Sequence, residues 1–112
     1  MYQLIESDWK LFKKLLPIWQ ERHLDKVIEE YKTILNQEEP SSEKFWELSN
    51  RMIKDKKNPG VMLHDIKRSE MHYHILLLLK NRVINESDLE DFSESLKISA
   101  KAWRKHLLKV DP

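Results

Sequence analysis

Apolar residues recur through most of the chain at intervals of three and four, the spacing of one face of an α-helix. The first stripe predicts a helix over residues 8–36 and contains Trp9, Phe12, Leu16, Trp19 and Val27. Pro17 interrupts it, and an interior proline removes one backbone hydrogen bond. Either one helix kinks there, or a first helix ends near Leu15 and a second begins at Pro17. Since the stripe keeps its phase across the proline, we expect a single helix kinked at Pro17.

A second helix is predicted over residues 42–56, with Ser41 or Ser42 as its N-cap. Its expected apolar stripe consists of Phe45, Leu48, Met52 and Ile53. Trp46 lies about 100° from that stripe, so it either widens the buried face or is exposed to solvent. The segment Asn58-Pro59-Gly60 follows as a turn signal and separates this helix from the next.

The third predicted helix, residues 61–82, contains the densest apolar run of the chain, Ile75–Leu79. Its second half is apolar nearly all round, which is typical of a helix that neighbours cover on several sides. The fourth, residues 86–109, has its apolar positions at Leu89, Phe92, Leu96, Ala100, Trp103 and Leu107. Asn85 and Asp88 are spaced as a variant of the capping box. The pattern therefore predicts an all-α, four-helix bundle-like fold, with residues 1–112 as a single helical domain.

Composition supports this fold class and excludes several kinds of functional site. The chain of 112 residues has one glycine, so a sheet protein with many tight turns is disfavoured. There is no cysteine, which excludes disulfides, thiolate metal sites and cysteine nucleophiles. The longest apolar run is far shorter than the roughly 20 residues of a membrane span, and the N-terminus lacks a signal-peptide pattern. We therefore expect a soluble, cytoplasmic protein with no membrane contact.

Five short segments stand out for their sequence: Ser7–Phe12, Pro17–Gln20, Glu43–Leu48, Asp55–Val61 and Leu89–Ser93. Together they resemble a group of small uncharacterised bacterial proteins. The resemblance implies a bacterial origin and an all-helical fold, and it transfers no functional residue. Some members of that group are labelled as multidrug transporters, and a chain without a predicted membrane span contradicts that label.

No pattern of residues predicts catalysis, a metal or a cofactor. The five histidines lack the i, i+4 spacing of a helical zinc pair, and His72 and His74 point to opposite sides of a helix. Adjacent carboxylates such as Glu90 and Asp91 diverge on a helix and do not form an acid–base pair. With one glycine there is no phosphate-cradling loop. We therefore predict that the chain is not an enzyme, and we expect no catalytic residue, metal ligand or cofactor.

Two surfaces are candidates for partner binding. Trp46 is the tryptophan outside the predicted core stripes, and exposed aromatic residues are enriched at binding hot spots. Lys101, Arg104 and Lys105 form a basic patch on the last helix, which complementation of the helix dipole would also produce. Our main hypothesis is a non-enzymatic interaction module that binds a protein or itself, such as a regulator or inhibitor of a larger bacterial machine. The alternative is a nucleic-acid-associated regulator that uses the basic patch, although a net charge of +1 does not favour it.

Overall fold

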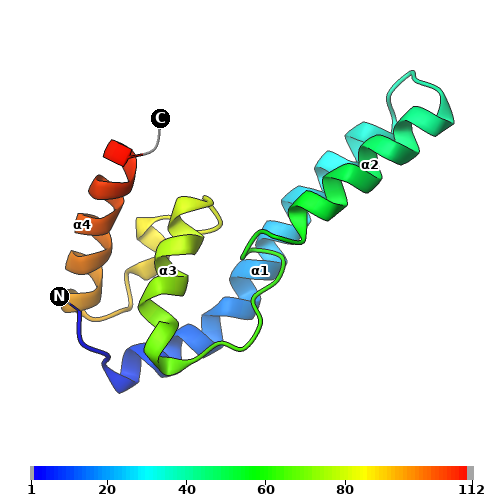
Figure 1. Ribbon diagram of the computed structural model, residues 1–112. Coiled ribbons are helices and arrows are strands. Elements are labelled where there is room, and N and C mark those ends of the chain that lie inside the picture. The colour runs from blue at the N-terminus through cyan, green and yellow to red at the C-terminus, as the bar shows by residue number, and fades with distance from the viewer. Residues whose placement is uncertain (1, 111–112) are drawn as a thin grey trace.

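The computed structural model describes residues 2–110, and the side chains of residues 2–106. Four α-helices follow one another: α1 (Glu6–Leu35), α2 (Ser41–Asp55), α3 (Met71–Lys80) and α4 (Glu94–Val110). Two 3-10 turns, η1 (Arg68–Glu70) and η2 (Glu86–Leu89), precede α3 and α4. The described residues contain no strand, so the predicted all-α, four-helix fold is confirmed (Figure 1).

Helix α1 runs without interruption through Pro17, so the prediction of one continuous helix is correct. The ribbon changes direction between its first turns and the rest of the helix, as expected next to an interior proline (Figure 1). The helix begins after Ile5, which supplies no side-chain cap, and it ends where the Asn36 N–H reaches the Lys32 carbonyl oxygen. Its length makes the molecule elongated, with principal extents of 52 × 31 × 23 Å.

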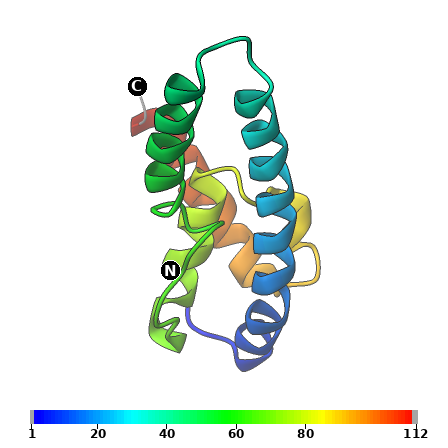
Figure 2. The ribbon, with the colours of Figure 1, turned by 90° about the vertical axis from the view of Figure 1, so that its right-hand side faces the viewer.

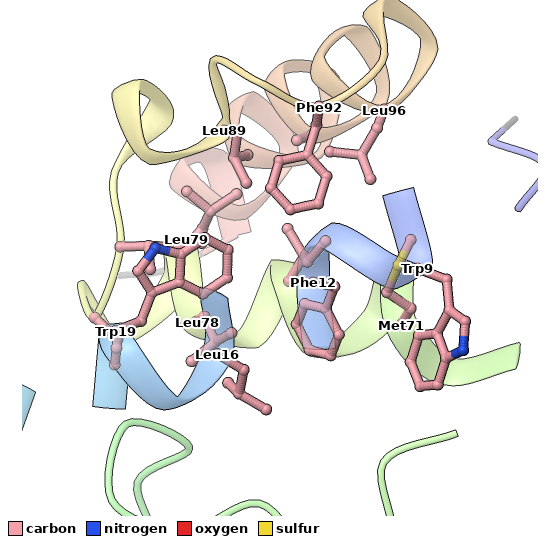
Figure 3. Packing of buried hydrophobic residues seen from close by; sticks show 14 residues of the cluster. Trp9, Phe12, Leu16, Trp19, Met71, Leu78, Leu79, Leu89, Phe92 and Leu96 are labelled. Carbon is pink, nitrogen blue, oxygen red and sulfur yellow. The ribbon is translucent and has the colours of Figure 1, made fainter. Parts of the chain in front are cut away.

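The hydrophobic core lies between the first half of α1, α3, η2 and the first half of α4 (Figure 3). An aromatic row runs through it. The ring of Phe12 lies 6.1 Å from that of Trp9 and 6.3 Å from that of Trp19, which in turn lies 6.2 Å from Phe92. Met71, Ile75, Leu78 and Leu79 of α3 pack against these rings. The apolar run of the sequence is therefore buried by helices on both sides, as expected.

The prediction of a helix over residues 61–82 is wrong in its first half, because residues 61–67 are not helical. The turn before them packs closely on α1, where the Gln20 side-chain amide donates to the Pro59 carbonyl oxygen over 3.1 Å. A Cβ on Gly60 would lie 2.6 Å from the His23 ring, so glycine is needed for this approach. Residues 61–67 then cross to the start of α3 as irregular chain, and Leu63 and Ile66 pack against the core.

The prediction of one helix over residues 86–109 is also wrong, because non-helical residues separate η2 from α4. The expected capping box is present: the Asn85 side chain accepts from the Asp88 N–H, and the Asp88 carboxylate accepts from the Asn85 N–H. It caps only the short turn η2. A second start follows at Ser93, whose hydroxyl accepts from the Leu96 N–H over 3.3 Å.

The apolar stripe nevertheless continues across this break. Leu89, Phe92, Leu96 and Ala100 are all buried, whereas Trp103, which the stripe predicts as core, is 44% exposed. The side chain of Leu107 lies outside the described residues.

Candidate functional site

Helix α2 packs on the second half of α1 as an antiparallel hairpin that projects from the rest of the molecule (Figures 1 and 2). In the second half of α1 the buried residues are Val27 and Ile34. On α2 no residue is buried, and five positions are half-buried: Lys44, Leu48, Ser49, Arg51 and Asp55. At about 100° per residue, all of these except Ser49 lie on the side that faces α1. Leu48 is the only apolar residue among these four, so the side of α2 turned toward α1 is mostly polar.

Hydrogen bonds and ion pairs hold this polar side in place. The Tyr31 hydroxyl donates to the Asp55 carboxylate over 2.6 Å. The Arg51 guanidinium lies 2.8 Å from Glu30 and 3.2 Å from Asp55, and 5.8 Å from the centre of the Tyr31 ring. Burial, followed by the hydrogen bond to Asp55, raises the pKa of Tyr31 to about 12, so the phenol stays protonated at neutral pH. These contacts fix the rotation of α2 about its own axis.

With α2 in this orientation, its apolar stripe faces the solvent. Phe45 is 62% exposed, Trp46 61% and Ile53 57%, and Met52 is exposed as well. At about 100° per residue, the centre of this stripe lies roughly 130° from the side that faces α1. The expectation that Phe45, Met52 and Ile53 form a buried stripe is therefore wrong. For Trp46, the exposed alternative is the correct one.

Helix α1 extends the same surface with Ile28 and Leu35, which are about half exposed. Each follows a residue buried in the hairpin, Val27 or Ile34, by one position. In two antiparallel helices that pack side by side, the residue that follows a contact residue lies on the same side of the pair in both helices. Ile28 and Leu35 therefore lie on the side of the hairpin where Phe45 and Met52 emerge.

We call these six residues the hairpin face: Ile28, Leu35, Phe45, Trp46, Met52 and Ile53. Within it the rings of Phe45 and Trp46 meet edge to face, 5.0 Å apart at 89°. Together the six side chains expose on the order of 600 Å², given full areas of about 200 Å² for large apolar side chains. This is the upper end of the roughly 300–600 Å² that the largest patch of a monomer exposes, and such patches are often functional.

The predicted basic patch does not form one site with Trp46, since it lies on α4 and Trp46 on α2. The patch is also divided. Arg104 pairs with Glu86 of η2 at 3.3 Å, and Lys101 lines a shallow hollow of about 260 Å³ together with Glu86 and Glu94. Lys105 is exposed.

Exposed Trp103 belongs to a groove of about 570 Å³ along the outer side of η1 and α3, where Tyr2, Tyr73 and Leu76 also contribute. Nearby, His72 stacks on the Tyr2 ring at 5.1 Å and lies 2.9 Å from the Ser99 hydroxyl. Within the described part of the chain, no three His, Asp or Glu side chains come together as metal ligands.

Comparison of the chain with protein-family models, with curated proteins and with solved structures gives no match. The resemblance to small bacterial proteins therefore stays a prediction. Among the described helices, none has both the length and the apolar composition that a membrane crossing requires.

The sequence pattern indicated Trp46 as a candidate binding residue but did not indicate the rest of the hairpin face. Periodicity identified the apolar positions of α2 correctly, and it assigned them to the core because that is where an amphipathic helix usually turns its apolar side. The signal against this assignment is the set of polar residues that tie α2 to α1. These pairings join residues more than twenty positions apart, and the sequence pattern does not reveal them.

Proposed function

We propose that this chain is a non-enzymatic protein-interaction module that binds a protein partner through the hairpin face. One observation carries the proposal: the apolar stripe of α2 points away from α1 and from the core. A helix whose own hairpin contact is polar gains its hydrophobic stabilisation by covering that stripe with another chain.

The size and chemistry of the hairpin face support this role. A stable interface buries about 800 Å² on each partner, and the apolar side chains here supply most of that area. Trp46 is the expected hot spot, because tryptophan is enriched among the few residues that contribute most of the binding energy of an interface.

The test is affinity capture with the tagged full chain in its native host, with each co-purifying protein quantified. The perturbing variant is Trp46→Ser combined with Ile53→Ser. The matched control is Glu47→Ser combined with Lys54→Ser, which changes two exposed polar residues on the same helix. Truncation of a hot-spot tryptophan costs about 2 kcal/mol or more, so the perturbing variant should bind its partner at least about 30-fold more weakly.

Light scattering of the purified chain supplies a second readout, since the partner can be another copy. A dimer that the Trp46 variant converts to monomer, and that the control leaves intact, identifies the partner as this chain itself. If every captured protein and the oligomeric state are the same in the perturbing variant and in the control, the hairpin face is not a binding surface and the proposal is wrong.

A further inference from the structure

A second and unrelated feature is a strongly basic cavity of about 670 Å³ between the middle of α1, the end of α3 and α4. Figure 2 shows the segment after α3, in yellow, beside the middle of α1. Five of the ten lining residues are permanent cations, and none of the ten is acidic: Arg22, Lys26, Lys80, Arg82 and Arg104. His23 also lines the cavity, and burial lowers its pKa. Leu79, Val83 and Ile84 add apolar surface. Three separate elements thus bring their basic residues to one cavity.

Two of these cations have fixed partners. Both terminal nitrogens of Arg22 lie 2.9 Å from the Asp88 carboxylate, and one also donates to the Val83 carbonyl oxygen over 3.2 Å. Burial acts to raise the pKa of Asp88, but the Arg22 hydrogen bonds and the Asn85 N–H outweigh it and hold that pKa below its usual value. Arg22 is therefore clamped by an ionised carboxylate, and Arg104 is paired with Glu86.

The remaining three cations are not neutralised. Among the described residues, no carboxylate lies within 4 Å of the charged groups of Lys26, Lys80 or Arg82. Positive charges gathered in one concave site repel one another and raise the local potential, and an anion with more than one charge relieves this repulsion. The cavity therefore holds an excess of positive charge, although the whole chain is nearly neutral.

The backbone at Arg82 gives independent support. Its φ is 59°, in the left-handed region that glycine usually occupies where a helix ends. The turn is closed by the Val83 N–H donating to the Leu78 carbonyl oxygen over 2.9 Å. Arginine is an unfavourable residue for this conformation, and such strain is concentrated at functional positions. The side chain of Arg82 lines the basic cavity, which gives a reason for arginine where glycine would suit the turn better.

We propose that this cavity binds a phosphate-bearing anion, with Lys26, Lys80 and Arg82 as its main contacts. Guanidinium groups match phosphate oxygens with two parallel hydrogen bonds, and ammonium groups add point charges. The volume falls within the roughly 300–1,000 Å³ of small-ligand sites and suits a group the size of a nucleotide. The phosphates can belong to a free small molecule or to a nucleic-acid backbone.

The test is isothermal titration of the purified full chain with three probes: sodium pyrophosphate, ADP and a single-stranded 12-nucleotide DNA. Sodium sulfate at matched ionic strength controls for unspecific charge effects. The decisive variant is Arg82→Gly, because glycine suits the left-handed turn and the fold is kept. A second variant is Lys26→Gln, and the matched control is Lys105→Gln, an exposed lysine that does not line the cavity.

We expect at least one phosphate probe to bind more tightly than sulfate, and each cavity variant to weaken it by about tenfold or more. Lys105→Gln should change it less than twofold. Binding of pyrophosphate or ADP without the oligonucleotide assigns a small phosphorylated ligand, whereas preference for the oligonucleotide assigns a nucleic-acid backbone. The proposal is overturned if no probe binds better than sulfate, or if Lys105→Gln weakens binding as much as Arg82→Gly does.

Discussion

Asp8 is 2% exposed, and its carboxylate connects three separate parts of the fold. It accepts hydrogen bonds from the Tyr2 hydroxyl over 2.9 Å, from the Ser93 N–H over 2.9 Å and from the Ser93 hydroxyl over 2.6 Å. The same Ser93 hydroxyl caps α4. Removal of this carboxylate should therefore loosen both the N-terminal segment and the start of α4.

The expected magnitude follows from these contacts. A hydrogen bond to a charged group contributes about 1.5–3 kcal/mol, and a buried donor left without a partner has a similar cost. Tyr2 and Ser93 are only half-buried, so water partly replaces the lost bonds. We therefore expect Asp8→Ala to lower the free energy of unfolding by about 2–4 kcal/mol, a large share of the roughly 5–15 kcal/mol of an ordinary domain.

Urea unfolding followed by tryptophan fluorescence measures this loss, because Trp9 and Trp19 are buried and become exposed on unfolding. Ser93→Ala and the double variant complete a cycle, in which we expect a coupling of about 1–2 kcal/mol. Ser7→Ala is the matched control. Ser7 lies inside α1 and is exposed, so its replacement should change stability by less than about 0.5 kcal/mol.

Two results would contradict this role of Asp8. One is an Asp8→Ala variant that loses less than about 1 kcal/mol, which would mean that the three hydrogen bonds contribute little beyond their desolvation cost. The other is strict additivity of Asp8→Ala and Ser93→Ala, which would mean that the two side chains do not act on each other.

Three further predictions concern the packing around the core. Gly60→Ala places a Cβ 2.6 Å from the His23 ring and should lower the free energy of unfolding by about 1–3 kcal/mol in the same urea assay; an unchanged midpoint would contradict the close approach. Asn85→Ala removes the capping box of η2 and should cost about 1 kcal/mol, which thermal unfolding would show as a lower Tm. Burial lowers the pKa of His74, with Glu70 opposing the effect, and neither ring nitrogen has a hydrogen-bond partner among the described residues. As the pH falls, the unfolded chain therefore takes up this proton before the folded chain does, so the free energy of unfolding should be full above pH 6.5 and decrease below it. His74→Phe should flatten this decrease. An identical pH profile for both proteins would exclude His74 as the cause of the pH dependence.

The two helices whose predicted bounds were wrong show why local sequence patterns predict the positions of helices better than their ends. Residues 61–67 contain apolar residues at helical spacing, yet Leu63 and Ile66 pack on the core from irregular chain. Gly60 and Pro59 are held against α1, and the chain must then span the distance to the start of α3. A non-helical segment is longer per residue than a helix, so it makes this connection with few residues.

The sequence pattern alone predicted the fold class, the continuity of α1 through Pro17 and most of the core. Each of these depends on the 3.6-residue period or on local capping, which are properties of neighbouring residues. It also determined that α2 is amphipathic and that Trp46 stands apart.

The folded structure alone shows which way the apolar side of α2 faces, because that depends on the hydrogen bonds of Tyr31 to Asp55 and of Arg51 to Glu30, which join distant residues. It also decided that Arg22, Lys26, Arg82 and Arg104 share one cavity, since they lie on three elements that meet only after folding. Both surfaces on which function is proposed therefore arise from contacts between distant segments, and no local pattern encodes such contacts.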